Sequence, residues 1–164
     1  MSFTSSGSNF TLLSGDEQLE TLRLNRLYRD WRQATHGSLL PGREFLDLQR
    51  HAYLEGMFLV VGVEDCEDDR CRYLYRSAGR HFVETLKVDP SGTYMDQHPE
   101  AGFAAQAMRA CDLVVKSRRP IHARADRDIG GRPFRIEFLL VPVAEHTDAV
   151  STILIAQIFT PVGA

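Results

Sequence analysis

The sequence predicts an α+β domain in which helices are inserted between the second and third strands of a five-stranded antiparallel sheet. Residues 57–63 and 151–159 form apolar runs that are typical of strands covered on both faces. Residues 99–118 space their apolar side chains three to four positions apart, which indicates a long helix. The sheet is therefore expected to have a helix against at least one face.

The chain divides into three expected regions: a flexible arm at 1–13, a helical extension at 14–56 and the α+β domain at 57–164. The 164 residues are 43% hydrophobic and 25% charged, as is ordinary for a globular protein. A net charge of −3 argues against a nucleic-acid partner. Because there is no long apolar segment and no secretory signal, we expect no membrane span and a cytoplasmic location. The odd number of cysteines, three, favours reduced thiols.

The N-terminal extension begins with a capping-box pattern, SGDE at 14–17, in which the hydroxyl and the carboxylate bond reciprocally to backbone N–H groups. This pattern predicts a helix at 16–35. Its apolar stripe comprises Leu19, Leu22, Leu27, Tyr28 and Trp31. A shorter helix is expected at 45–53. The first helix, or a second copy of the protein, is expected to cover the outer face of the sheet.

The first two strands form a hairpin whose turn is centred on residues 68–69. Complementary charges favour a register with Cys66 opposite Cys71. This register predicts the pairs Asp65–Arg72, Glu67–Arg70 and Gly62–Tyr75. The glycine would leave space for the tyrosine ring.

The third strand follows Pro120, which favours an edge position because proline donates no ladder hydrogen bond. The turn at Gly130 and Gly131 then joins it to the fourth strand. That register predicts the pairs Ile129–Arg132, Asp126–Arg135 and Arg124–Glu137. A last hairpin joins residues 133–143 to 150–159.

Four stretches carry a resemblance to a known family: LYRDW at 27–31, LPGR at 40–43, YLYRSAG at 73–79 and LLVPV at 139–143. Together with the element order, they make the chain similar to a bacterial family of short, mostly single-domain proteins with a PAS-like fold. The resemblance spans residues 19–160. The sequence departs from it at Arg80, where the family usually has threonine, and the segment at 81–88 also matches loosely.

The resemblance implies a non-catalytic sensory or regulatory domain that binds a small molecule or a partner protein in signal transduction. We expect occupancy to be transmitted through the N-terminal helix to another protein, because the sequence contains no output domain. A homodimer is expected from the apolar stripe of that helix and the outer face of the sheet. The family supplies no catalytic residues.

The candidate ligand-binding residues are Arg76, Tyr75, His81, Phe103, Met108 and Cys111. Arg76 closes the second strand and is interpreted either as an anion clamp at the mouth of a cavity or as a structural arginine that binds backbone carbonyls. The apolar residues of the long helix line either a ligand pocket or an ordinary core. His81 and His98 are each a lone histidine, and each is most simply a surface or packed residue.

No cofactor or metal is expected. Flavin sensors of the PAS class carry a cysteine within an Asn-Cys-Arg segment, and haem sensors usually take a histidine from the long helix; this sequence has neither feature. Cys66 and Cys71 could sense oxidants through a strained cross-strand disulfide, but acidic neighbours favour inert thiols. Two alternatives stay open. One is a small cone-shaped enzyme with a buried acid, Glu137, beside Tyr73 or Tyr75, and the other is a ligand-free interaction domain.

Overall fold

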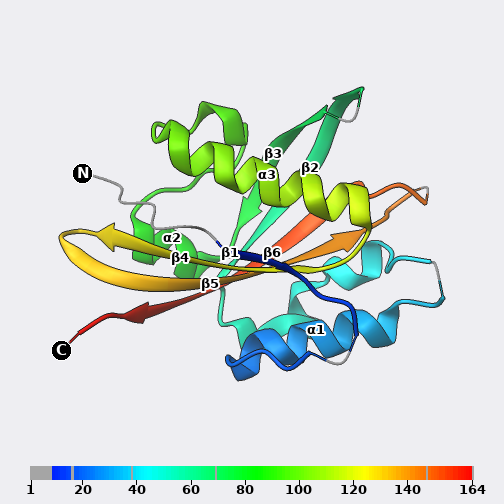
Figure 1. Ribbon diagram of the computed structural model, residues 1–164, viewed down its shortest axis with the longest axis horizontal. Coiled ribbons are helices and arrows are strands. Elements are labelled where there is room, and N and C mark those ends of the chain that lie inside the picture. The colour runs from blue at the N-terminus through cyan, green and yellow to red at the C-terminus, as the bar shows by residue number, and fades with distance from the viewer. Residues whose placement is uncertain (1–8, 16, 38, 69, 147, 164) are drawn as a thin grey trace.

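The structure is a computed structural model that describes residues 9–15, 17–37, 39–68, 70–146 and 148–163. Within these residues, antiparallel pairing joins six strands into one sheet in the order β1-β4-β5-β6-β2-β3. The strands are β1 (Asn9–Leu12), β2 (Phe58–Glu67), β3 (Arg70–Ala78), β4 (Ile121–Ile129), β5 (Arg132–Val143) and β6 (Thr152–Pro161). The helices are α1 (Leu22–Ala34), η1 (Arg43–Leu46), η2 (Leu48–Leu54), α2 (Arg80–Leu86), η3 (Met95–Gln97) and α3 (Ala101–Ser117). The α+β class and the insertion of helices between the second and third predicted strands are confirmed (Figure 1).

Strand β1 departs from the expected five-stranded layout. Residues 9–12 belong to the predicted mobile arm, yet Phe10 pairs with Ala123, and the N–H of Leu13 donates to Pro120 O at 3.0 Å. The open edge of β4 offers unpaired backbone groups, and the arm satisfies them. Pro120 therefore precedes a strand that is covered, and the predicted edge position is wrong. The rest of the arm, residues 1–8, lies outside the described residues.

The capping-box pattern forms hydrogen bonds but starts no helix. The N–H and hydroxyl of Ser14 both donate to Glu17 Oε1, at 2.8 and 2.7 Å. These bonds, the one from the Ser14 hydroxyl foremost, lower the pKa of Glu17 to about 2. Arg32 donates to the Gly15 carbonyl, so this turn is tied to the side of α1. The helix begins only at Leu22 rather than at the predicted residue 16.

The second predicted helix, at 45–53, is replaced by the 3₁₀ segments η1 and η2. Asp47 between them is extended, and its carboxylate accepts the N–H of Gln49 at 3.1 Å, a local bond that competes with helix continuation. Inside η2, His51 leaves helical geometry and its Nε2 lies 2.7 Å from the carbonyl of Phe45. The α-helical prediction is therefore wrong here; Phe45 is buried, whereas Leu48 and Ala52 are exposed.

Helix α1 covers the outer face of the sheet, as expected (Figure 1). Leu24, Leu27 and Trp31 are buried against β2, β5 and β6, and Trp31 Nε1 donates to Pro142 O at 2.8 Å. This burial occupies most of the stripe that led us to expect a homodimer, although Leu22 remains exposed. Homodimerisation therefore stays a prediction, but the apolar stripe no longer supports it because α1 buries that stripe within the same chain.

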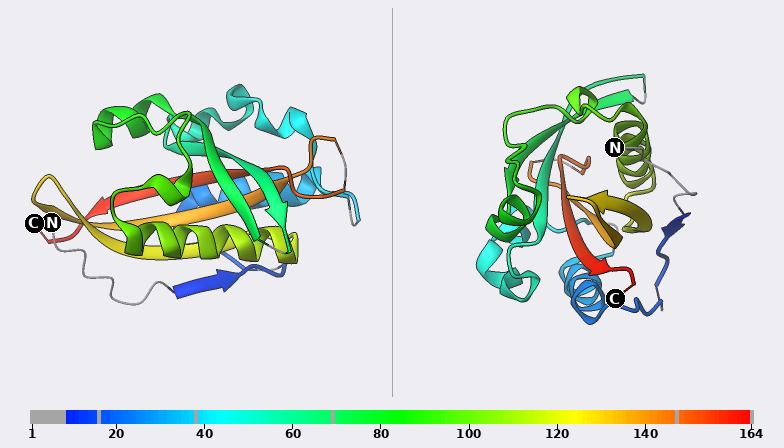
Figure 2. Two further views of the ribbon diagram at one scale, coloured as in Figure 1. Left: turned by 90° about the horizontal axis from the view of Figure 1, so that it is seen from above. Right: turned by 90° about the vertical axis from the view of Figure 1, so that its left-hand side faces the viewer.

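Helix α3 packs on the opposite, inner face (Figure 2). It lies within the predicted range of 99–118. Ala110, Cys111 and Val114 are buried there in a second apolar cluster. The two helices therefore sandwich the sheet, and the doubly apolar pattern of its central strands is explained.

The predicted register of the β4–β5 hairpin is confirmed at all three pairs. Side chains follow it only in part. Arg135 forms the predicted ion pair with Asp126, at 3.3 Å. Arg124 instead pairs with Glu20 at 2.9 Å. Its predicted partner, Glu137, pairs with His122 at 3.2 Å. The predicted register is therefore correct for backbone pairing, but it does not determine which side chains form ion pairs.

The β2–β3 hairpin keeps the predicted Glu67–Arg70 pair and loses the others. Register irregularities follow Val60 and Glu64, and Asp65 adopts a left-handed φ of 45°. Arg72 consequently faces Glu64 instead of Asp65. Two further differences concern the glycine: Gly62 faces Leu74, and Tyr75 faces Val61.

Candidate functional site

A cavity of about 570 Å³ lies between the inner face of the sheet and the inserted helices. Strands β2 to β6 supply its floor, α2 and η3 one wall, and the first half of α3 another. Ring side chains dominate the lining: Phe10, Tyr75, Phe82, Tyr94, His98, Phe103 and Phe138. This size lies within the range of about 300–1,000 Å³ that is typical of small-molecule sites.

Small side chains explain why space remains there. Ala123 and Ala125 of β4 line the cavity from the sheet, and Ala107 and Ala110 line it from α3. Close packing normally fills such an interface with larger residues. Here the four alanines face the space from both sides, and a hollow remains instead of a close contact.

Gln157 places an amide in this apolar surface. It comes from β6, the residue is only 6% exposed, and it lines the cavity. Its cross-strand neighbour is Phe138, and Ile155 lies two residues before it on the same face. Across the described residues, no hydrogen bond is formed by the Gln157 side chain. The residue is buried but its amide atoms are open to the cavity, so this group has unused hydrogen-bonding capacity for a ligand.

Tyr75 presents a second polar group to the same space. The residue is buried on β3 and lines the cavity, and its hydroxyl has no hydrogen-bond partner in the described part of the chain. Burial raises the pKa of Tyr75, so the phenol stays protonated and can donate. Together with Gln157 it offers hydrogen bonding inside an otherwise apolar chamber.

A charged cluster lies at the start of α3. Glu100 Oε1 is 3.7 Å from Arg127 Nη2, and the Arg127 guanidinium lies 4.8 Å from the centre of the Phe103 ring. The other oxygen, Glu100 Oε2, is buried without a hydrogen-bond partner among the described residues. Nδ1 of His98 accepts the Glu100 N–H at 3.0 Å, and burial, followed by the nearby Arg127, lowers the pKa of His98. All four residues line the cavity.

The candidate residues from the sequence lie in three different environments: the cavity wall, the core and the exposed surface. Tyr75 and Phe103 line the cavity. Cys111 is fully buried in the core beneath α3, where burial raises the pKa of its thiol, and Met108 is partly buried against the same core without lining the cavity. His81 is exposed in the first turn of α2. The long helix thus contributes both cavity wall and ordinary core.

Arg76 lies on the other face of the sheet from Tyr75. Its guanidinium contacts Glu145 at 3.1 Å, Glu64 at 3.4 Å and the Thr152 hydroxyl at 3.0 Å. It also covers Gly62, where an added Cβ would clash with Arg76 Nε. The space that the sequence analysis assigned to the Tyr75 ring therefore accommodates an arginine, which fastens strand ends to one another.

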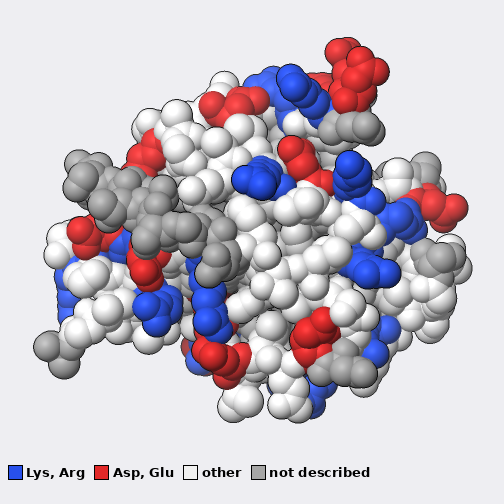
Figure 3. Space-filling view, in the orientation of Figure 1, with Lys and Arg blue, Asp and Glu red and all other residues white. Residues whose placement is uncertain are grey.

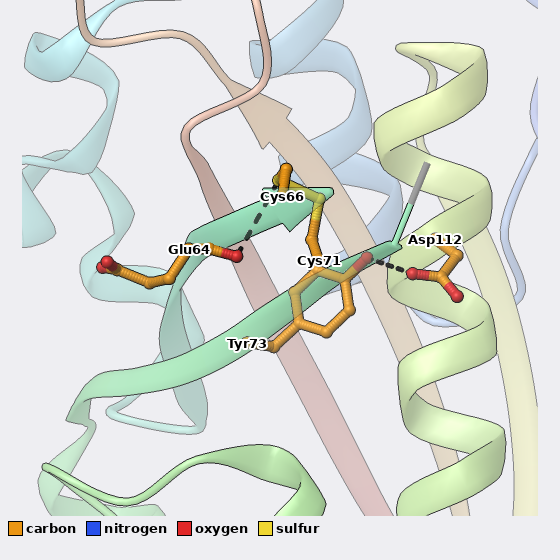
Figure 4. Close-up of a disulfide and its surroundings, with 5 residues drawn as sticks. All are labelled: Glu64, Cys66, Cys71, Tyr73 and Asp112. Carbon is orange, nitrogen blue, oxygen red and sulfur yellow. Dashed lines mark hydrogen bonds between the residues drawn. A yellow bond between two sulfur atoms is a disulfide. The ribbon is translucent and has the colours of Figure 1, made fainter. Parts of the chain in front are cut away.

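The residues considered for an enzyme do not converge. Glu137 pairs with His122 on the outer face, whereas Tyr75 faces the cavity. Tyr73 is buried on the inner face and donates to Asp112 of α3 (Figure 4).

No group of residues suited to holding a metal ion occurs among the described residues. Nor is any helix in that part of the chain long and apolar enough to cross a membrane.

Cys66 and Cys71 form a disulfide at the tip of the β2–β3 hairpin (Figure 4). The expectation of reduced thiols is therefore wrong for this pair, because the hairpin brings their Cα atoms to 4.0 Å. The sulfur of Cys66 also lies 3.8 Å from the Glu64 carbonyl. Cys111 keeps a free thiol.

Acidic side chains gather at the tip of the β2–β3 hairpin, while charges of both signs are interspersed over the rest of the visible face (Figure 3).

Three polar residues of the cavity, Gln157, Glu100 and Arg127, were not predicted from the sequence. Gln157 carried a signal, since it is the polar position within the apolar run at 151–159 that falls on the inner face. Glu100 and Arg127 carried none, because they come from a helix start and a distant strand. Only the fold brings them together.

No family model and no curated protein matches the chain. Several solved structures resemble it, three of which are described here. A domain of an HTR-like protein from Haloarcula marismortui is 18% identical over 62% of this chain and 96% of that chain, with a TM-score of 0.39. An RNA-binding Light-Oxygen-Voltage receptor is 12% identical over 96% of this chain and 39% of that chain, with a TM-score of 0.45. A fungal LOV domain photoreceptor is 11% identical over 72% of this chain and 94% of that chain, with a TM-score of 0.42. All three TM-scores are below 0.5, so function has to be argued from the cavity itself.

Proposed function

We propose that this protein is a PAS-like sensory or regulatory domain that binds a small molecule between the sheet and α3. The observation that carries the proposal is the buried amide of Gln157, which faces a cavity of about 570 Å³ without a partner among the described residues. Protein interiors are close-packed, and their buried polar groups are normally hydrogen-bonded. A ligand with an apolar body and a polar edge would satisfy both requirements at once.

The same observation argues against a ligand-free interaction domain. Such a domain gains nothing from keeping a large apolar hollow, since lost packing contacts around an unfilled cavity reduce stability. Water would satisfy Gln157 only in part, because the surrounding walls are largely rings and aliphatic side chains. A bound molecule accounts for both the hollow and the amide.

Strand β6 offers a route by which occupancy reaches the outer face. Gln157 points to the cavity, whereas its neighbour Ala156 is buried in the cluster that contains α1. A ligand that shifts β6 therefore acts directly on the packing of the N-terminal helix. We propose that this helix transmits the signal to a protein partner in trans, in the cytoplasm.

Native mass spectrometry of the purified full chain tests ligand binding, with 1-naphthylmethanol added as a neutral probe. Ala107→Phe places a ring in the cavity and should abolish any adduct, although overpacking costs typically 1–3 kcal/mol and its folding must be checked by circular dichroism. Ala105→Phe is the matched control, because Ala105 is exposed on the same helix. The proposal expects an endogenous or probe adduct in the wild type and the control. A wild-type chain that carries neither adduct overturns it.

A further inference from the structure

We propose that the ligand is a neutral or cationic molecule whose apolar body ends in a hydroxyl or amine that donates a hydrogen bond to Glu100 Oε2. This inference rests on the proposed function and deepens it by naming the ligand class. It follows from three features of the cavity: an orphaned carboxylate oxygen, an arginine that is already engaged, and unpaired polar groups on the floor.

The orphaned oxygen supplies the acceptor. The Glu100 side chain lines the cavity and is 30% exposed as a whole, but its Oε2 atom is buried and has no hydrogen-bond partner in the described part of the chain. A carboxylate is an acceptor only, so the group that completes it must be a donor. A hydrogen bond to a charged acceptor contributes more than a neutral one, and more again away from water.

The guanidinium of Arg127 does not favour an anionic ligand. Arg127 contacts Glu100 Oε1 at 3.7 Å and covers the ring of Phe103 at 4.8 Å, so its charge is already shared. Among the described lining residues, the charged side chains are Asp89, Glu100, Arg124, Arg127 and Asp128. Carboxylates outnumber guanidiniums in that set, which disfavours carboxylate or phosphate ligands. The lowered pKa of His98 leaves that ring neutral, so it adds no positive charge.

The floor supplies a second polar contact. Gln157 and Tyr75 lie on β6 and β3, on the sheet side of the cavity, while Glu100 lies at the start of α3 on the other side. Apolar rings and alanines cover the walls between them. A matching ligand therefore has an apolar, preferably aromatic, middle, a donor at one end and a group that pairs with an amide or phenol at the other.

Four naphthalene probes that share one ring system test the donor requirement: 1-naphthylmethanol, 1-naphthylmethylamine, 1-methylnaphthalene and 1-naphthoate. Their dissociation constants for the full chain are measured by titration of naphthalene fluorescence. The alcohol and the amine are expected to bind on the order of tenfold more tightly than 1-methylnaphthalene, and 1-naphthoate least tightly. Equal affinities for all four, or tightest binding of 1-naphthoate, overturn the inference.

The variant Glu100→Gln tests whether Glu100 causes the preference for hydrogen-bond donors, because the amide keeps the size of the side chain and removes its charge. The advantage of the amine over 1-methylnaphthalene should fall by about tenfold, and 1-naphthoate should bind more tightly because Arg127 loses its carboxylate. Glu84→Gln, at an exposed position of α2 that does not line the cavity, is the control and should keep the wild-type order. An unchanged order in Glu100→Gln also overturns the inference. If 1-methylnaphthalene binds without any donor preference, the proposed function stands; if no probe binds and no endogenous adduct is found, that function fails as well.

Discussion

The two faces of the sheet solve the same packing problem in opposite ways. On the outer face, α1 and the 3₁₀ segments bring large side chains such as Leu27, Trp31 and Phe45 into full contact with the strands. On the inner face, α3 meets the sheet partly through alanines, and a cavity of about 570 Å³ remains. The outer face is built for stability, whereas part of the inner face gives up packing and leaves polar groups unpaired. A site that is kept at the expense of stability is a functional candidate.

Polar side chains on the two faces sharpen the contrast. The indole of Trp31 and the ring of His51 both have backbone carbonyl partners on the outer side. In the cavity, the Gln157 amide and Glu100 Oε2 have none among the described residues. Substitutions on the two faces should consequently change stability in opposite directions.

The largest effect is expected for Trp31→Ala on the outer face. Loss of a buried indole and of its bond to the Pro142 carbonyl should lower the free energy of unfolding by about 3–5 kcal/mol, as measured by urea denaturation. Leu22→Ala is the control, because Leu22 lies on the same helix with its side chain 82% exposed, and it should change that free energy by less than about 0.5 kcal/mol. A loss of under 1 kcal/mol for Trp31→Ala would contradict close packing of α1 on the sheet.

Gln157→Leu should have a smaller effect of opposite sign. In chain freed of ligand by refolding from denaturant, removal of the unpaired amide is expected to raise the free energy of unfolding by about 1 kcal/mol. Gln33→Leu, at an exposed position of α1, should leave it within about 0.5 kcal/mol. If Gln157→Leu instead destabilises the chain, the amide has a protein partner, and the contrast between the faces is weakened.

The smallest effect concerns Arg76→Met and depends on pH. Burial alone would raise the pKa of Glu145, but hydrogen bonds from Thr152 and Arg76 outweigh it and lower that pKa in the folded state. The interaction therefore stabilises the fold above the unfolded-state pKa of Glu145 and is lost as pH falls through the lower, folded-state value. At pH 7 the variant should be less stable than the wild type by up to about 1 kcal/mol, and this difference should shrink in acid.

Urea denaturation between pH 7 and pH 3 measures that difference. Arg80→Met is the matched control, since Arg80 is almost fully exposed in its pair with Glu84, and it should differ little from the wild type at any pH. A constant gap between wild type and Arg76→Met would show that Arg76 acts through packing over Gly62 instead of through Glu145.

Elements with strong periodicity were predictable from the sequence. The long helix, the β4–β5 register and the covering of the outer face by the N-terminal helix all followed from apolar spacing and charge complementarity. The start of α1 was not predictable, because the same Ser14 and Glu17 bonds that open a helix can also close an isolated turn. Strand β1 was missed because it has only four residues and pairs only where β4 offers an open edge.

The candidate site was predictable only where a residue's own strand or helix points it inward. Tyr75 and Phe103 met that condition. Arg76 next to Tyr75 did not, because successive residues of a strand face opposite sides of the sheet. Glu100 and Arg127 lie far apart in sequence, and no local pattern records their contact.

The central claim, that the inner face holds a small molecule, is tested most directly by ¹³C methyl NMR of alanine-labelled protein titrated with 1-naphthylmethanol. Ala107, Ala110, Ala123 and Ala125 report on the cavity, whereas Ala34 and Ala156 report on the outer cluster. Saturable shifts that are large in the first group and small in the second are expected. If no methyl resonance shifts saturably, or if only those of Ala34 and Ala156 do, the cavity is not the binding site.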